Sequence, residues 1–119
     1  MKVKLLSVSA LLLILLSSCS NDSTNDLITI NNNTISYTNS VKSIINNNCL
    51  QCHGATPSFG APMSLTTYEE VRDAVLNRGL IDRISRTEGQ SGAMPLGGPK
   101  LPQVSINVIN QWKNEGFVE

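Results

Sequence analysis

The sequence has few histidines, few aromatic residues and no excess of either charge. His53 is the only histidine among 119 residues, and Phe, Tyr and Trp together make up 4%. So few aromatic side chains leave only a thin core for a small domain. Nine basic and nine acidic residues give a formal net charge of 0, whereas nucleic-acid binding depends on basic surfaces. The composition therefore predicts no nucleic-acid partner.

Two of the three cysteines stand together, in the run Cys49-Leu50-Gln51-Cys52-His53. Cys-x-x-Cys-His is the attachment signature of c-type haem. The two-residue gap lets two thiols reach two vinyl groups of one porphyrin, and the histidine that follows directly can bind the iron. Because the run occurs once, the sequence predicts one covalent haem and one iron.

Two other chemistries also use a Cys-x-x-Cys pair. A thioredoxin-like dithiol usually belongs to a βαβ unit, and the sequence shows no such pattern. A four-ligand zinc site needs two more Cys or His, and the chain has no second histidine. The alternatives to haem are a dithiol or disulfide of Cys49 and Cys52, or an incomplete metal site.

Residues 1–18 resemble the signal peptide of a bacterial lipoprotein. Two lysines precede an apolar run over residues 5–16, which is too short to span a bilayer comfortably. The letters LSSC that end at Cys19 resemble a lipobox, in which the chain is cut before the cysteine. The resemblance implies that Cys19 anchors the protein by lipid in the cell envelope, on the periplasmic side or at the cell surface. A secreted protein with a free Cys19 is the alternative.

Residues 19–38 are rich in Asn, Ser, Thr and Asp. This composition predicts a polar tether between the lipid and a folded domain over residues 39–119. A short hairpin over residues 28–37, with three asparagines at its turn, is the alternative. Haem of the c type is attached outside the cytoplasmic membrane, so the lipobox and the Cys-x-x-Cys-His run agree on the compartment.

Apolar spacing within residues 39–119 predicts helices and no sheet of any size. The first helix, capped near residues 38–40, runs into Cys49. The second begins with the capping box of Thr67 and Glu70 and ends at Gly79. The expected inward side chains of these two helices are Val41, Ile44 and Ile45, then Tyr68, Val71, Val75 and Leu76.

Two further helical segments follow. Residues 80–84 form a short helical piece, and a last helix begins with Pro102 and stops at Gly116. The side chains expected on the buried side of the last helix are Val104, Val108, Ile109 and Trp112.

Two loops rich in Gly and Pro flank the second helix. The first loop holds Pro57 and Pro62, either of which could offer a backbone carbonyl to the second nitrogen of His53. The alternative for each proline, favoured at least equally, is that it only shapes the loop. The second loop presents Met94, the predicted sixth iron ligand, because a thioether suits low-spin haem iron. Met63 is the other candidate, but its loop follows His53 closely, which disfavours a path to the opposite haem face.

The order of these features resembles a class I-type, single-haem cytochrome c domain over roughly residues 38–119. The features are a helix, the Cys-x-x-Cys-His run, a second helix, a loop with Met94-Pro95 and a C-terminal helix with Trp112. The resemblance implies an all-α fold of three to four helices around one covalently bound haem. It also implies that Trp112 lies near the crossing of the first and last helices or near a propionate; core packing is the favoured alternative.

Two arginines are further candidates for haem contacts. Arg83 and Arg86 could pair with haem propionates, and a solvated face is the favoured alternative for both. The list of possible haem contacts is then Pro57, Pro62, Arg83 and Trp112.

The resemblance implies a single-electron carrier rather than an enzyme, because two protein ligands leave no open position on the iron. Expected partners are membrane or periplasmic redox proteins, together with the lipid membrane through Cys19. One alternative is a haem peroxidase or gas sensor with an open sixth position; the lack of a second histidine disfavours the peroxidase. The other is a non-haem lipoprotein with a redox pair of Cys49 and Cys52.

Overall fold

The computed structural model describes residues 34–119. The predicted signal peptide, the lipidation residue Cys19 and residues 19–33 of the predicted tether lie outside this part of the chain. Helices are the regular secondary structure of residues 34–119, joined by loops, and this part contains no strand, which confirms the all-α class for it. None of its helices has the length and hydropathy that a bilayer crossing requires.

The first helix begins earlier than the sequence predicts. A π-helical segment, η2 (Tyr37–Val41), leads directly into α2 (Lys42–Asn48). The hydroxyl oxygen of Ser36 caps it by accepting a hydrogen bond from the backbone N–H of Asn39 at 3.1 Å. The predicted cap near residues 38–40 is therefore wrong. Ser36 and Tyr37 are buried, so the folded part starts before residue 39.

The alternative hairpin over residues 28–37 falls only partly within the described chain. Residues 34–36 form no strand, and Tyr37 is already helical. Residues 28–33 lie outside the described part. The second half of the hairpin is therefore excluded, because the helix takes up its last residue.

The second helix, α3 (Tyr68–Asn77), has the predicted capping box. The Thr67 hydroxyl accepts from the Glu70 N–H at 3.2 Å, and the Glu70 carboxylate accepts from the Thr67 N–H at 3.0 Å. Gly79, with φ of 67°, lies just beyond the helix end and directly before α4 (Leu80–Ser85). This left-handed conformation favours glycine, so the predicted stop is confirmed.

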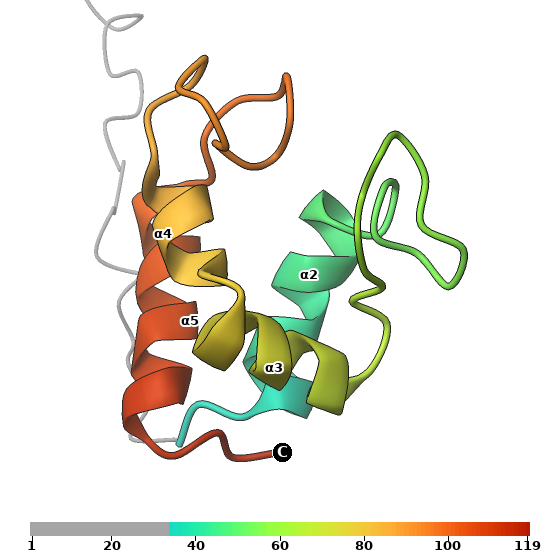
Figure 1. Cartoon of the computed structure of the whole chain (residues 1–119). Coiled ribbons are helices and arrows are strands. Elements are labelled where there is room, and N and C mark those ends of the chain that lie inside the picture. Colours follow the sequence, from blue (N-terminus) through green and yellow to red (C-terminus); the bar gives the residue numbers. More distant parts are fainter. Residues whose placement is uncertain (1–33) are drawn as a thin grey trace, which may run out of the picture. The chain divides into compact units, whose positions relative to one another are not determined.

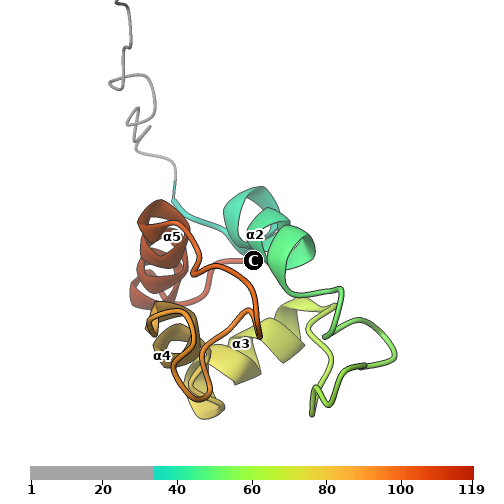
Figure 2. The same cartoon turned by 90° about the horizontal axis from the view of Figure 1, so that it is seen from above.

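The last helix, α5 (Gln103–Asn114), follows the second loop. Pro102 is its N-cap rather than its first helical residue. Gly116 follows the helix with φ of 84°, as predicted for a stop. In Figure 1, α4 and α5 lie on one side of the molecule, while α2 lies on the other, and α3 runs beneath both. Seen from above, α4 and α5 lie side by side, and α2 lies across from α4 (Figure 2).

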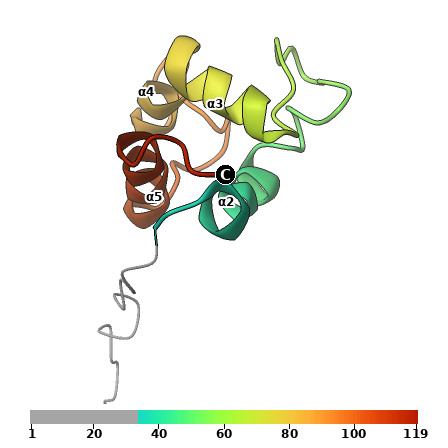
Figure 3. The ribbon, with the colours of Figure 1, turned by 90° about the horizontal axis from the view of Figure 1, so that it is seen from below.

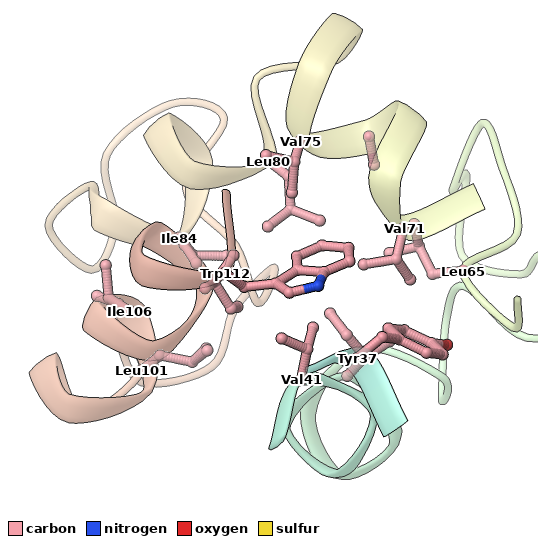
Figure 4. Close-up of a cluster of buried hydrophobic side chains, with 13 residues drawn as sticks. Tyr37, Val41, Leu65, Val71, Val75, Leu80, Ile84, Leu101, Ile106 and Trp112 are labelled. Carbon is pink, nitrogen blue, oxygen red and sulfur yellow. The ribbon is translucent and has the colours of Figure 1, made fainter. Parts of the chain in front are cut away.

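Trp112 lies at the centre of the hydrophobic core and is completely buried. Figure 4 shows its indole between Tyr37 and Val41 on one side and Val71 and Val75 on the other. Its ring centroid is 5.9 Å from that of Tyr37, which places it where η2 packs against α5. Core packing, the favoured expectation for this residue, is confirmed.

The buried stripe of two helices differs from the prediction. Leu76 on α3 and Val104 on α5 are 46% and 64% exposed, so both were wrongly assigned to the inner side. Ile106 is buried instead, three residues before Ile109. The stripe Ile106, Ile109 and Trp112 has helical spacing as well, and contact with neighbouring helices selects it.

The C-terminal segment joins three helices. The carbonyl of Val118 accepts from the backbone N–H of Tyr37 at 2.8 Å and from the indole Nε1–H of Trp112 at 2.7 Å. The carbonyl of Phe117 accepts from the Tyr68 hydroxyl at 2.8 Å. Viewed from below, the C-terminus lies between α2 and α5 (Figure 3). The segment thereby links η2, α3 and α5.

Candidate functional site

A cavity of about 840 Å³ opens between the two long loops. Its lining residues come from the end of α2 and the loop after it, from the end of α3, from α4 and from the loop before α5. Cys49, Cys52, His53 and Met94 all line it. The volume lies in the range of roughly 300–1,000 Å³ that is typical of ligand and cofactor pockets. Residues distant in sequence therefore meet in one space.

A tight turn brings the two thiols and the imidazole to the same wall. The N–H of Cys49 still donates to the Ile45 carbonyl at 2.8 Å, so Cys49 terminates α2. Its own carbonyl accepts from the N–H groups of Cys52 at 3.1 Å and of His53 at 2.8 Å. The next residue is Gly54, where an added Cβ would lie 3.0 Å from a backbone oxygen. The turn therefore leaves little room for a side chain after the histidine.

The imidazole of His53 is buried and has a fixed tautomer. Its Nδ1 lies 2.8 Å from the carbonyl oxygen of Met63. A carbonyl only accepts hydrogen bonds, so Nδ1 carries a hydrogen, and in the neutral ring the lone pair is then on Nε2. Such a nitrogen can bind a metal ion without first losing a proton.

The predicted partner of His53 was wrong. The carbonyl comes from Met63 rather than from Pro57 or Pro62. Pro62 lines the cavity, whereas Pro57 is exposed and does not. The chain returns at Leu65, whose N–H donates to the His53 carbonyl at 2.8 Å. No residue type marks this acceptor, because every residue has a carbonyl; only the path of the loop selects Met63.

The two thiols are free and partly buried. Burial, and to a smaller extent the neighbouring Cys52, raises the pKa of the Cys49 thiol to about 11. At neutral pH this thiol is therefore protonated. Within residues 34–119, no three His, Cys, Asp or Glu side chains gather into a group that could hold a metal ion.

Met94 enters the cavity from the loop opposite His53. Its backbone N–H donates to the Arg83 carbonyl at 3.0 Å, which attaches this part of the loop to α4. Met63 also lines the cavity, but its carbonyl is bound to His53. Both candidate methionines therefore line the cavity, but the backbone of Met94 is bonded to α4, whereas that of Met63 is bonded to His53.

The remaining predicted contacts separate into two groups. Arg83 lines the cavity and is available to an anionic group there. Arg86 is absent from the lining, and its guanidinium contacts Asp82 instead. Trp112 does not line the cavity either, because its indole N–H donates to Val118 within the core. Of the four possible haem contacts, only Pro62 and Arg83 reach the cavity.

Comparison with protein-family models, curated proteins and solved structures finds no match for this chain. The interpretation of the cavity therefore depends on its own residues.

Proposed function

We propose that the protein is a single-electron carrier with one covalent c-type haem, anchored by lipid at Cys19 outside the cytoplasmic membrane. The observation that carries the proposal is the meeting of Cys49, Cys52 and His53 with Met94 in one cavity. The haem, when bound, supplies a ferric/ferrous couple. In this proposal residues 39–119 are a class I-type cytochrome c domain.

The proposal gives a role in haem binding to six of the residues that line the cavity. Cys49 and Cys52 would hold the haem by thioether bonds. His53 would offer Nε2 to the iron, and its Nδ1 lies 2.8 Å from the Met63 carbonyl, which would keep the ring in that tautomer. Met94 would offer its thioether as the second iron ligand. Arg83, which lines the same cavity, would pair with a propionate.

The number of protein ligands on the iron would decide which reactions the site can carry out. With His53 and Met94 both bound to the iron, the site would have no open position for a substrate and would exchange only electrons. Partners would be membrane or periplasmic redox proteins, which usually dock through small interfaces, below about 1,200 Å².

The Cys49 thiol argues against the alternative of a redox pair that uses Cys49 as its nucleophile. The attacking cysteine of a reactive dithiol has a pKa below the ordinary range, whereas burial raises the pKa of Cys49 to about 11. A thiol that remains protonated at neutral pH is a poor nucleophile. The buried, protonated state suits a cysteine whose sulfur is to be covered by a bound group.

The absorption spectrum of the protein, made in cells that attach c-type haem, tests the proposal. We expect sharp reduced c-type bands and, in the ferric state, the weak long-wavelength band of sulfur bound to iron. The matched control is the double variant Cys49→Ser, Cys52→Ser, which should contain no covalent haem after denaturation in acid and organic solvent. High-spin haem bands in the unmodified protein would favour a peroxidase or gas sensor, and absence of haem would overturn the proposal.

A further inference from the structure

The guanidinium of Arg86 joins α4 to the loop that carries Met94. Its Nε and Nη2 donate to one carboxylate oxygen of Asp82, at 3.1 and 2.6 Å. Its Nη1 donates to the Ser91 carbonyl at 2.6 Å. Asp82 lies in the first turn of α4, and Arg86 caps its C-terminal end, four residues later. The carboxylate therefore orients the guanidinium toward the loop.

Gly92 makes room for this contact. Its φ is 75°, and a Cβ at this position would lie 2.5 Å from Nη1 of Arg86 and 3.3 Å from Nη1 of Arg83. The carbonyl of Gly92 also accepts from Nη1 of Arg83 at 3.4 Å. Two successive loop carbonyls, those of Ser91 and Gly92, therefore bind arginines of α4.

The contact lies close to Met94 along the chain. Met94 follows Gly92 by two residues, and its N–H donates to the Arg83 carbonyl. The loop is otherwise held by short internal turns, such as the bond from the Ala93 N–H to the Gln90 carbonyl at 2.9 Å. Without the arginine, the loop between α4 and Met94 would keep its local turns but lose its strongest link to the helix.

We propose that Arg86, oriented by Asp82, is a positioning residue that holds Met94 in place to bind the iron. The inference rests on the proposed function. Ordering a loop costs conformational entropy, so a loop already fixed to α4 keeps more of the protein in the ligand-competent state. An external ligand that competes with Met94 then binds more weakly.

Titration of the ferric holoprotein with imidazole, followed by loss of the sulfur–iron band, tests the inference. In Arg86→Ala we expect half-loss of the band at about tenfold lower imidazole concentration, since a charge-assisted hydrogen bond is removed. Gly92→Ala, which displaces the guanidinium, should act in the same direction. Arg72→Ala is the control, because it removes an equal charge from α3, where Arg72 lies over the Phe117 ring, and it should titrate like the unmodified protein.

Repeating the Arg86→Ala substitution in a Met94→Leu variant distinguishes a specific effect on Met94 from a general loss of order around the haem. In Met94→Leu, imidazole no longer competes with a thioether, so adding Arg86→Ala should leave the imidazole affinity, read from the haem bands, unchanged. An equal effect of Arg86→Ala in both backgrounds would overturn the inference, as would no effect in the background with Met94. In both of these cases the proposed function stands if the unmodified protein shows the sulfur–iron band. Absence of that band in the unmodified protein would overturn both.

Discussion

At the scale of single residues, the two methionines that line the cavity differ in what supports them. The Met63 backbone is bound to His53, whereas Met94 stands in the opposite loop and is attached to α4. Met63 would then hold the His53 ring through its carbonyl, and Met94 would offer the iron its thioether. This proposed division of roles between Met94 and Met63 can be measured.

Met94→Leu should remove the sulfur–iron band of the ferric protein and lower its reduction potential, because the thioether of a His/Met pair raises the potential. The measurement is an absorption spectrum with a redox titration. Met63→Leu is the control: it keeps the backbone carbonyl that His53 uses, so the band should persist. Loss of the band in Met63→Leu alone would assign the ligand to Met63 instead.

At the scale of elements, α3 begins with a carboxylate that accepts several hydrogen bonds. Partial desolvation opposes ionisation of Glu70, but bonds from the N–H groups of Thr67 and Thr66 and from the hydroxyls of Thr66 and Ser64 outweigh it. Together they lower the pKa of Glu70 below its ordinary value of 4.5. A carboxyl group with a lowered pKa in the folded state stabilises the fold above its ordinary pKa. That stability is lost as the pH falls through the lowered value.

Glu70→Gln should therefore lower the melting temperature at pH 7, and the difference from the unmodified protein should shrink as the pH falls below about 4. Thermal melts followed by circular dichroism between pH 2 and 7 measure this. Glu69→Gln is the matched control, because Glu69 shares the first turn of α3 but makes no capping bond to Thr67. A pH-independent difference for Glu70→Gln would contradict the capping explanation.

At the scale of the whole molecule, the last residues of the chain connect helices that are distant in sequence. The Val118 carbonyl is the acceptor for both Tyr37 on η2 and Trp112 on α5. Both donors lie at buried residues, where an N–H without a partner costs about 1–3 kcal/mol. The core around Trp112 thus depends on a segment outside the helices.

Deleting Val118 and Glu119 should destabilise the domain by about 2 kcal/mol, or about 8–16 °C in Tm, since two buried donors lose their acceptor. Thermal melts and the emission maximum of Trp112 report the change. Deleting Glu119 alone is the control, because Val118 then ends in a carboxylate that still accepts. An unchanged Tm in the longer deletion would show that water replaces Val118 at these donors.

Local signals were predictable because their partners lie within a few residues. The capping box of Thr67 and Glu70 and the stops at Gly79 and Gly116 all agree with the structure. Each depends on a bond or a φ angle that the local sequence fixes on its own. The early start at Ser36 was missed because the cap was assigned among residues 38–40, where the polar side chains look equally suitable.

The candidate site also has features that short stretches of sequence predict and features that depend on tertiary contacts. The sequence by itself determined the all-α class and the Cys-x-x-Cys-His run, because spacing and helix signals are properties of short stretches; Met94 as the iron ligand stays a prediction. Only the tertiary structure decided that the Met63 carbonyl orients His53 and that Arg86 contacts Ser91. Backbone carbonyls are alike in every residue, so a sequence cannot show which one a side chain will meet. That choice depends on how loops return to the helices, and the packing around the core fixes it.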